Sequence, residues 1–506
     1  MPGTDVANEG KVSSTLEDLG LMVGATRAGD WSKPAVITGL AVDSRDVKPG
    51  FLFFALPGVS VHGGEFVTYA LRMGAVAIVT DRHGFDLAES DGAVDVPVLI
   101  LNDPRLALAK AASRWFAKQP ETMVAVTGTN GKTSVASFTR QIWEDLGALA
   151  VNFGTTGVEG AVAAPLSHTT PEPITLHRLL ADLAVQKVSH AAMEASSHGL
   201  AQRRLDGVHL RAAGFTNISR DHLDYHPDFE DYFQAKAGLF SRVLPKDATA
   251  VINMDDDHGP RLASMAAERG QNVIGVGYGA DDLRILNARF DATGQDLRFE
   301  WRGVVQMARL DLIGGFQAEN ALVAAGLAIA TGFEPSDVFR ALGNLKTVRG
   351  RMQRAAVRSN GAAIYVDYAH TPDALATALQ ALRPHVMGRL IVVFGAGGDR
   401  DTGKRPLMGR AAQEHADVVF VTDDNPRSED PALIRAAIMA EIPGANEIGD
   451  RAEAILAATD ALQPGDTLLI AGKGHESGQI IGDDILPFDD AEAASVAVAA
   501  LEGLGA

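Results

Sequence analysis

Residues 123–134 read MVAVTGTNGKTS. The apolar run at 123–126 predicts a buried strand, and it leads directly into a glycine-containing turn. Beyond the turn, the three- and four-residue spacing of apolar side chains predicts an amphipathic helix. These side chains are Val135, Phe138, Ile142, Trp143 and Leu146. A strand, a glycine loop and a helix in this order are typical of a nucleotide-binding site.

The loop itself carries the groups that phosphate binding requires. Its glycines let backbone N–H groups surround phosphate oxygens, Lys132 can neutralise their charge, and the Thr133 hydroxyl can bind Mg²⁺. The common phosphate-loop pattern has a further glycine where this chain has Val126, so the loop is a shortened variant. We therefore predict a nucleoside triphosphate as ligand. Its predicted contacts are Gly128, Thr129, Asn130, Gly131, Lys132, Thr133 and Ser134.

The length of 506 residues predicts about three domains, because one continuous core becomes rare beyond about 300 residues. Short apolar runs at 51–56, 75–79 and 98–101 alternate with turn signals and indicate a small α/β unit. From residue 363 onward, apolar runs alternate with helix-length stretches, which predicts a parallel sheet of βαβ units. These runs are 363–366, 390–394, 418–421 and 467–470. We expect domains at 1–120, 121–347 and 348–506.

Charge and cysteine content exclude several classes of function. The chain has 64 acidic and 45 basic residues, a net charge of −19, and such a chain repels nucleic acid unless its basic residues are concentrated. With no cysteine, thiolate metal sites and cysteine nucleophiles are excluded. The first residues lack a signal-peptide pattern, and there is no apolar run of about 18 residues. We expect a cytoplasmic protein with neither nucleic acid nor membrane as partner.

A dense polar cluster follows each of the four C-terminal apolar runs. The clusters occupy 367–370, 397–400, 423–427 and 472–476. Any one of them alone is typical of an ordinary solvated loop. Because ligands of open α/β sheets bind outside the carboxyl ends of the strands, the four together predict one shared crevice.

The phosphate loop and the motifs around it, from Asp43-Ser44-Arg45 to the cluster at 472–476, resemble in content and order the ATP-dependent Mur ligase family. This family builds the peptide of bacterial cell-wall precursors. The resemblance implies a central phosphate-loop-type ATPase sheet and a C-terminal Rossmann-like sheet. It also implies an amide-forming ligase that adds meso-2,6-diaminopimelate to UDP-N-acetylmuramoyl-L-alanyl-D-glutamate through an acyl phosphate.

A magnesium centre is predicted beside the phosphate loop. Carboxylate, histidine and threonine side chains are reasonable ligands for Mg²⁺, and our candidates are Glu194, His222 and Thr133. A lone histidine after a strand is more often structural, so His222 depends on the phosphate loop for its assignment. A lysine on a helix, such as Lys236, is normally exposed to solvent, so its residue type alone indicates no role in this centre. The resemblance implies that CO₂ carbamylates it to N6-carboxylysine, an anionic ligand, and that His198 lies near the reacting phosphate.

The resemblance also assigns binding residues for the two nucleotides. For ATP it implies Asn320, Arg351 and Asp367; the family usually has asparagine in place of Gln317.

For the UDP-muramoyl-peptide the resemblance includes Asp43-Ser44-Arg45, although this motif alone could equally be a polar turn. The family usually has asparagine in place of His168. For the UDP-muramoyl-peptide it implies Val42, Ser44, Val59, Ser60, Val61, Thr169, Thr170, Ser196, Gln202 and Arg204.

The amino-acid substrate follows from carboxylate chemistry. Diaminopimelate carries a distal carboxylate and a distal ammonium, and the guanidinium of Arg427 can bind both oxygens of a carboxylate. Arg400 would reach the carboxylate end and Glu476 the ammonium. Lysine lacks the second carboxylate and would leave Arg427 unpaired, at a cost of a few kcal/mol, roughly. The predicted site comprises Arg400, Asp424, Asn425, Pro426, Arg427, Gly472 and Glu476.

Three alternatives remain open at this point. A lysine-adding ligase or a folylpolyglutamate-type synthase would share the phosphate loop and the carbamate lysine pattern, although the clusters at 424–427 and 472–476 argue against both. A nucleotide-regulated binding protein without turnover is the alternative from another class. We expect a monomer in which the third domain closes onto the reaction centre.

Overall fold

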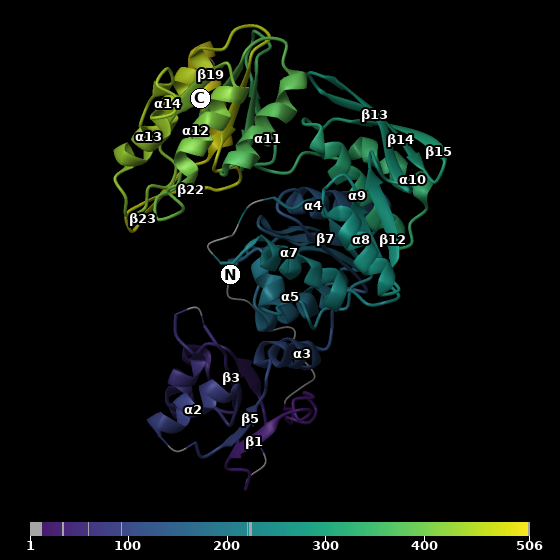
Figure 1. The fold of residues 1–506 in the computed structure, drawn as a ribbon, viewed down its shortest axis with the longest axis vertical. Helices are drawn as coiled ribbons and strands as arrows, with labels where there is room; N and C mark the ends of the chain where they lie inside the picture. Colours follow the sequence, from purple (N-terminus) through teal and green to yellow (C-terminus); the bar gives the residue numbers. More distant parts are fainter. Residues whose placement is uncertain are drawn as a thin grey trace.

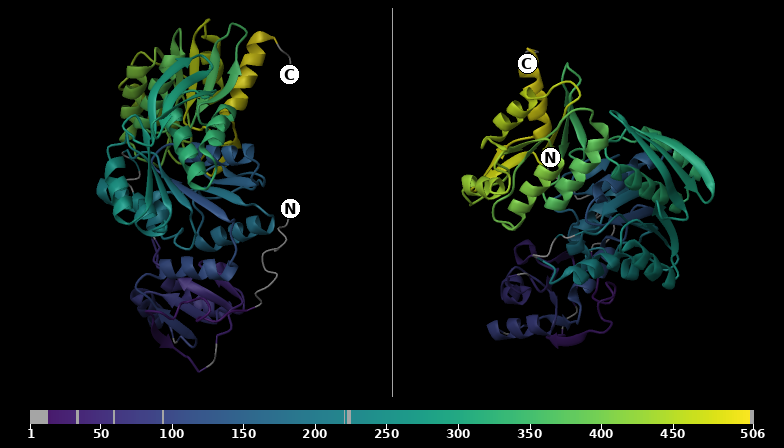
Figure 2. Two further views of the ribbon diagram at one scale, coloured as in Figure 1. Left: turned by 90° about the vertical axis from the view of Figure 1, so that its right-hand side faces the viewer. Right: turned by 45° about the horizontal axis from the view of Figure 1, so that its top comes forward.

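The computed structural model describes residues 13–32, 35–58, 60–92, 94–219, 221 and 225–503. Three bodies follow one another along the long axis, with the N-terminal body (purple) at the bottom and the C-terminal body at the top (Figure 1). Each body contains its own main sheet, of five, ten and six strands. Two further views place the C-terminal helix on the outer surface (Figure 2). The predicted α/β class is confirmed.

The N-terminal body is a five-stranded sheet packed against helices. Its strands follow the order β1-β5-β4-β3-β2 and are parallel except for β1. The three predicted apolar runs form β3, β4 and β5. The elements are β1 (Thr26–Gly29), β2 (Gly39–Ala41), β3 (Phe51–Ala55), α1 (Val67–Arg72), β4 (Ala77–Thr80), α2 (Arg82–Asp91), β5 (Pro97–Ile100) and α3 (Pro104–Phe116).

The central body is a ten-stranded sheet in the order β15-β14-β13-β12-β11-β10-β6-β9-β7-β8. The strands from β12 to β7 are parallel. The elements are β6 (Thr122–Thr127), α4 (Lys132–Asp145), β7 (Ala150–Gly154), β8 (Gly157–Gly160), α5 (Pro173–Val185), β9 (His190–Glu194), α6 (Ser197–Ala201), β10 (Ala212–Phe215), α7 (Phe229–Gly238), β11 (Thr249–Asn253), α8 (Gly259–Glu268), β12 (Asn272–Gly277), β13 (Leu283–Asp291), β14 (Gly294–Trp301), β15 (Val304–Leu310), α9 (Phe316–Ala330) and α10 (Pro335–Ala341).

Helices cover both faces of this central sheet. On one face α4 and α9 share a core, in which the predicted helix side chains Val135, Phe138 and Ile142 are fully buried. On the other face α5, α7 and α8 contribute to a second core. Burial of each large apolar side chain stabilises the fold by ~1.5–3 kcal/mol. The predicted amphipathic helix is confirmed, and it fixes the phosphate loop because the loop leads directly into α4.

An antiparallel extension of the central sheet was not predicted from the sequence. Strands β13, β14 and β15 form a meander beyond β12, and one face of this meander is exposed (Figure 1). Its alternation of buried and exposed residues, as in Leu297 and Phe299 against their exposed neighbours, is the pattern of a half-buried antiparallel sheet.

The C-terminal body confirms the predicted parallel sheet. Strands β17, β21, β18, β19 and β20 are parallel neighbours in that order, and β16 adds an antiparallel edge. The four predicted runs form β17, β18, β19 and β21. The elements are β16 (Gln353–Val357), β17 (Ala363–Asp367), α11 (Pro372–Leu382), β18 (Leu390–Phe394), α12 (Lys404–His415), β19 (Val418–Val421), α13 (Pro431–Met439), β20 (Asn446–Glu447), α14 (Arg451–Asp460), β21 (Thr467–Ala471), β22 (Gly478–Ile481), β23 (Asp484–Pro487) and α15 (Asp490–Glu502).

A short linker joins the central and C-terminal bodies and is held by the phosphate-loop helix. The side chain of Gln141 in α4 accepts a hydrogen bond from Lys346 N (2.7 Å) and donates one to Lys346 O (3.1 Å). Four residues later Gly350 has a φ of +69°, and a Cβ there would lie 2.2 Å from His475 N. The linker is therefore fixed to α4 at one end and packed against the C-terminal body at the other.

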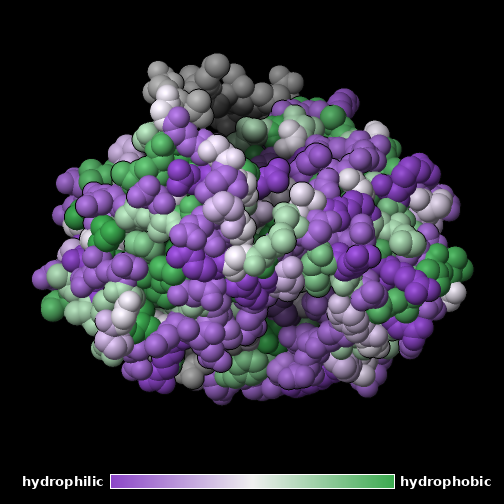
Figure 3. Space-filling model, turned by 90° about the horizontal axis from the view of Figure 1, so that it is seen from above, coloured by the Kyte–Doolittle hydropathy of each residue, from purple (hydrophilic) through white to green (hydrophobic). Residues whose placement is uncertain are grey.

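The face of the molecule seen from above the C-terminal body is mainly polar. Hydrophilic residues cover most of this face and hydrophobic ones are scattered between them (Figure 3). In the part of the chain that the structure describes, we found no helix with the length and apolar character needed to span a membrane.

Candidate active site

The phosphate loop lies at the carboxyl end of β6, between the loops that follow β9 and β10. Gly131 precedes α4 with a φ of +86°. A Cβ at Gly131 would lie 2.5 Å from Asn320 Oδ1, and one at Gly128 would lie 1.9 Å from Thr216 Oγ1. Both positions require glycine because any side chain would collide with the neighbouring segments. The first N–H groups of α4 point out of the helix toward the loop, as in an anion-binding site.

Lys132 is folded back over this loop. Its Nζ donates hydrogen bonds to the carbonyl oxygens of Gly128 (2.9 Å) and Thr129 (2.8 Å). Burial lowers the pKa of Lys132, and the nearby carboxylates of Glu194 and Asp221 partly oppose this shift. The ammonium therefore sits where the negative charge of a bound phosphate would be neutralised.

Glu194 ends β9 beside the loop and is 2% exposed. Its Oε2 accepts a hydrogen bond from Thr133 Oγ1 (3.1 Å), and Thr155 donates to the same carboxylate through its backbone N (2.8 Å) and its hydroxyl (3.1 Å). A carboxylate next to a threonine hydroxyl fits the oxygen preference of Mg²⁺. His222 lies outside the described residues, and within those residues no group of three or more His, Asp or Glu could hold a metal.

Lys236 is buried in α7, at 2% exposure, whereas residue type alone indicated a solvated position. Its Nζ donates a hydrogen bond to Gly128 O (2.7 Å) and lies 4.5 Å from the ring centroid of Tyr232. Burial, reinforced by the positive charge of Lys132, holds the pKa of Lys236 well below its usual range. Two lysines thus converge on one carbonyl oxygen of the phosphate loop.

A polar network next to Glu194 contains the central residues predicted for the muramoyl-peptide. Thr170 Oγ1 donates to Glu194 O (3.0 Å) and accepts from Ser196 N (3.0 Å). Arg204 donates to Thr170 O (2.5 Å) and to Gln202 Oε1 (2.8 Å). Thr169 lies 3.1 Å from Thr155, hydroxyl to hydroxyl. The structure therefore brings these predicted residues together around the end of β9.

Further along the same loops, the His198 ring contacts the Tyr225 ring, with centroids 4.0 Å apart and the ring planes tilted by 40°. The Tyr225 hydroxyl in turn accepts a hydrogen bond from Gln202 Nε2 (3.1 Å). His198 therefore lies within reach of the muramoyl-peptide residues, and His168 lines the same cavity as Thr169 and Thr170.

The N-terminal residues predicted for the UDP end lie apart from this network. Asp43 caps a 3₁₀ turn at Ser44–Asp46 by accepting a hydrogen bond from Arg45 N (2.9 Å), so locally the motif is a polar turn. Val42 lines a separate cavity of about 830 Å³ along the edge strand β2. Ser60 and Val61 follow β3. Val59 lies outside the described residues.

The predicted ATP residues come from the central body and the third domain and lie around the phosphate loop. Arg351 Nη2 donates to Thr133 Oγ1 (3.3 Å), and its guanidinium lies 4.5 Å from the Tyr368 ring centroid. Asp367 accepts hydrogen bonds from Met352 N (2.8 Å) and Ala369 N (2.9 Å), and its burial raises the pKa of this carboxyl. Asn320 donates to Gln317 Oε1 (3.2 Å), so Gln317 orients the asparagine amide.

One cavity of about 700 Å³ connects these groups. Its walls come from the phosphate loop, the ends of β9 and β10, the start of α9 and the loop after β17. Residues of this lining include Asn130, Lys132, Thr133, Thr170, Glu194, Ser196, His198, Arg204, Lys236, Asn320, Arg351, Asp367 and His370. A triphosphate and a second, peptide-like substrate can therefore lie side by side in one cleft.

The predicted amino-acid residues form a second cluster at the carboxyl ends of β18, β19 and β21. Asn425 donates to Glu476 Oε2 (3.0 Å), and Arg427 Nη1 donates to Gly398 O (2.8 Å). Asp424 and Asn425 are buried, whereas Arg400 is exposed. Three of the four predicted loops thus meet directly, and the loop after β17 joins them through the Tyr368–His475 ring contact at 5.1 Å.

Several residues of both clusters were not predicted individually. Thr155, which orients Glu194, comes from the turn between β7 and β8, and no local pattern marks it. Asp221 lines the cavity near Lys132. Lys473 is fully buried among Asp424, Asn425 and Glu476, and Arg451 is fully buried behind them. Only their position between the predicted residues reveals them.

Comparisons with known proteins identify one family along the whole chain. Family models match along the chain in order: the Mur ligase family catalytic domain at 36–116, the Mur ligase middle domain at 126–328 and the Mur ligase glutamate ligase domain at 350–474. The chain is 53% identical over 476 residues to the UDP-N-acetylmuramoyl-L-alanyl-D-glutamate--2,6-diaminopimelate ligase of Bradyrhizobium diazoefficiens, covering 92% of this chain and 96% of that relative.

Solved structures give the same picture of the fold. A solved UDP-N-acetylmuramoyl-L-alanyl-D-glutamate--2,6-diaminopimelate ligase superposes with a TM-score of 0.69 at 33% identity, covering 97% of this chain and 99% of that one. A folylpolyglutamate synthase of Mycobacterium tuberculosis, solved with ADP, superposes with a TM-score of 0.61 at 19% identity. This second match covers 78% of the present chain and shows a shared fold alone.

Proposed function

The chain belongs to the Mur ligase family, and from that premise we propose that it adds meso-2,6-diaminopimelate to UDP-N-acetylmuramoyl-L-alanyl-D-glutamate at the expense of ATP. The observation that carries this proposal is the 700 Å³ cavity, in which the phosphate loop faces Thr170, Ser196 and Arg204. These groups can hold a triphosphate and an anionic peptide side by side, which is what transfer of a phosphoryl group between them requires.

The reaction follows from placing the two substrates together. The side-chain carboxylate of D-glutamate attacks the γ-phosphorus of ATP, the bond to the bridging oxygen of ADP breaks, and an acyl phosphate forms. The amine of diaminopimelate then attacks the acyl carbon and phosphate leaves, which forms the amide bond. Lys132 and the N–H groups of the loop stabilise the charge that builds up on the transferred phosphoryl group.

Magnesium is proposed as the metal cofactor. Thr133 and Glu194 would hold it, with His222 and a carbamylated Lys236 as further ligands. When bound, Mg²⁺ supplies positive charge to the phosphate oxygens and helps to orient them. The hydrogen bonds from Thr155 to Glu194 keep this carboxylate turned toward Thr133 and leave it little freedom to move away.

Carbamylation of Lys236 would resolve an electrostatic conflict in this centre. The Lys236 and Lys132 amines both contact the Gly128 carbonyl oxygen, and both would face a metal cation. In carbamylation the ammonium first loses a proton, the neutral amine adds to the carbon of CO₂, a C–N bond forms and a second proton is released, so a cation becomes an anion. We expect native mass spectrometry to show a mass increase of one CO₂ in the wild type that is absent in Lys236→Ala. An unmodified Lys236 in a fully active sample would contradict this assignment.

The three domains would divide the substrates between them. We propose that residues 1–120 bind the UDP end through Val42, Ser44 and residues 59–61, that residues 121–347 bind ATP, and that residues 348–506 bind the amino acid and close onto the centre. We further propose that the enzyme acts as a monomer in the cytoplasm, where ATP is available. Light scattering at working concentrations would reveal a stable oligomer if this proposal is wrong.

Specificity for diaminopimelate would come from the cluster around Arg427. Its guanidinium can form two hydrogen bonds to the distal carboxylate, with Arg400 close by, while Asp424 and Glu476 face the distal ammonium. Asn425 donates to Glu476 and so joins the two halves of this cluster. L-lysine offers no partner for Arg427, which disfavours the lysine-adding alternative.

The decisive experiment is an assay of phosphate release with the purified protein. We expect release only when ATP, Mg²⁺, UDP-N-acetylmuramoyl-L-alanyl-D-glutamate and meso-diaminopimelate are all present, and far less with L-lysine. Turnover with a folate and glutamate would favour the folylpolyglutamate alternative. Binding of ATP without any substrate-dependent release would instead indicate a nucleotide-regulated binding protein.

A further inference from the structure

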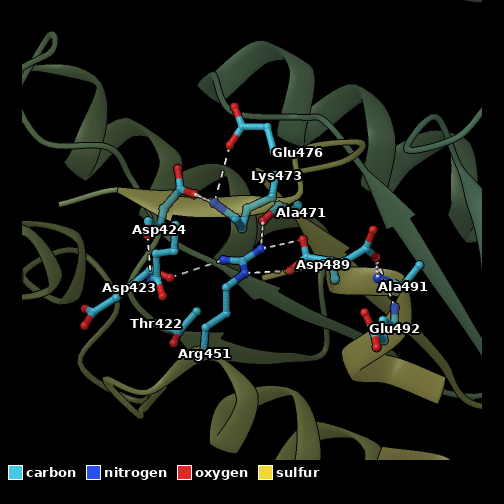
Figure 4. Close-up of polar contacts among 12 residues, drawn as sticks. Thr422, Asp423, Asp424, Arg451, Ala471, Lys473, Glu476, Asp489, Ala491 and Glu492 are labelled. Atoms are coloured by element: carbon cyan, nitrogen blue, oxygen red, sulfur yellow. Dashed lines mark hydrogen bonds and ion pairs between the residues drawn. The ribbon is translucent and has the colours of Figure 1, made fainter. Parts of the chain in front are cut away.

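Lys473 occupies the centre of the amino-acid cluster, yet none of the roles above is assigned to it. Its side chain is 0% exposed. The Nζ lies 3.3 Å from Glu476 Oε2 and 3.6 Å from Asp424 Oδ1. Figure 4 shows the ammonium between these two carboxylates, which come from the loops after β21 and β19. A fully buried lysine needs such partners, since an unpaired charge is costly to bury.

The same ammonium also fixes the amide of Asn425. It donates a hydrogen bond to Asn425 Oδ1 (2.9 Å), which accepts a second one from Ile480 N (3.0 Å). With its oxygen held on that side, the amide must present Nδ2 to Glu476 Oε2, at 3.0 Å. Lys473 therefore determines how three polar groups of the site are oriented.

The backbone that carries Lys473 is itself tied down from behind. Arg451 donates to Ala471 O (3.0 Å) and to Asp423 O (3.3 Å), at the ends of β21 and β19. It also forms a fully buried ion pair with Asp490 at the start of α15. Figure 4 shows Arg451 beneath the loops that bear Asp424 and Lys473. The two strand ends cannot separate without breaking these contacts, so the distances around Lys473 are held closely.

We propose that Lys473 sets the charge selectivity of the amino-acid site. Asp424 and Glu476 together carry two negative charges, and Lys473 reduces their sum to one. The ammonium-facing half of the site then matches a single ammonium, while Arg427 faces the carboxylate. Without Lys473 this half of the site would carry one more negative charge. That charge would repel the distal carboxylate of diaminopimelate, whereas L-lysine, which has only an ammonium at this end, would still be attracted.

This inference rests on the proposed function, so the test begins with wild-type protein. The ratio of kcat/KM for meso-diaminopimelate to that for L-lysine is measured by phosphate release in the wild type and in Lys473→Met. We expect the ratio to fall by at least about tenfold in the variant, because one full charge is removed within a few ångströms of the substrate. The KM values for ATP and for the UDP-muramoyl-dipeptide should change by less than about twofold, since neither substrate contacts this cluster.

A charge-compensating variant separates selectivity from loss of structure. In the double variant Lys473→Met/Glu476→Gln the net charge of the cluster returns to minus one, and the ratio should recover toward the wild-type value. Melting temperature and ATP binding of all variants report on folding. An unchanged ratio in Lys473→Met, or no recovery in the double variant, would overturn the inference while the proposed function stands. If the wild type shows no amino-acid-dependent turnover, both are wrong.

Discussion

The phosphate loop and the amino-acid cluster both lie at the carboxyl ends of parallel strands, but they are built in different ways. In the phosphate loop, one continuous segment supplies the glycines, the lysine and the threonine, and this segment leads directly into α4. The amino-acid cluster is assembled from loops that are far apart in the sequence and held together by the buried cations Arg451 and Lys473. The order of residues within a continuous motif determines most of its geometry. The geometry of a cluster assembled from several loops depends instead on the side chains that pack behind those loops.

If this contrast is correct, the largest effect should come from removing Lys132. Lys132→Ala should reduce ATP-dependent ligation by about 10³-fold or more, because the charge of the transferred phosphoryl group loses its fixed partner. The melting temperature should change little, since the ammonium bonds only to the carbonyl oxygens of Gly128 and Thr129 and to no other described residue. Lys246→Ala, at an exposed position, is the matched control. Near-normal turnover of Lys132→Ala would remove the basis for the assignment.

The buried ion pair behind the amino-acid cluster should contribute to stability instead. Arg451→Met leaves Asp490 buried without its partner and should lower the free energy of unfolding by ~3–5 kcal/mol. The double variant Arg451→Met/Asp490→Leu removes both charges and should recover part of this loss. Chemical denaturation measures both. A single variant as stable as the wild type would mean that the cluster does not depend on this pair.

Arg427 should affect one substrate only. Arg427→Met should lower kcat/KM for meso-diaminopimelate by about 10²-fold, which corresponds to the loss of a charge-assisted hydrogen-bonded pair of ~2–3 kcal/mol. Turnover with L-lysine and the affinity for ATP should stay within about threefold. Arg340→Met changes an exposed arginine outside the site and serves as the control. A parallel loss with both amino acids would show that Arg427 does not read the second carboxylate.

At Glu319, on the ATP side of the comparison, the expected effect is on stability alone and depends on pH. Burial raises the pKa of Glu319 to about 7, with Asp255 and Asp256 adding to the shift. Between pH 4.5 and 7 the folded state binds this proton more tightly than the unfolded state, so stability decreases as pH rises. Glu319→Gln should therefore gain up to ~3 kcal/mol relative to the wild type at pH 8 and nothing at pH 4. Thermal unfolding of the free protein at both pH values measures this difference, and an equal gain at both would contradict it.

Much of the fold could be predicted from the sequence because its signals are local. The apolar runs and the helix after the phosphate loop follow from the spacing of residues such as Val135 and Phe138. The meander from β13 to β15 was missed, although residues of β14 such as Leu297 and Phe299 alternate with polar ones. Antiparallel strands of this kind are recognised mainly by their partners across the sheet.

The candidate sites also differ in how much of them could be predicted from local sequence. The phosphate loop was predicted as one motif, but burial of Lys236 could not be, because it depends on where α7 meets Gly128 in space. Thr155 acts through a neighbour from another element, and nothing in its own surroundings in the sequence marks it. Lys473 lies within the predicted cluster at 472–476, but its contact with Asn425 depends on a second loop. The residue types of the amino-acid cluster were predicted, whereas the cations that organise it became visible only in three dimensions.

The clamp of Gln141 on Lys346 limits how the C-terminal domain can move. Only Thr347, Val348 and Arg349 lie between this clamp and Gly350, and three residues span at most about 11 Å when fully extended. The C-terminal domain is therefore held close to the phosphate loop by a short linker and cannot diffuse away from it. An amino acid bound by this domain, as proposed above, would be confined to a small volume around the cavity, so the effective concentration of its attacking amine would be high before any closure takes place.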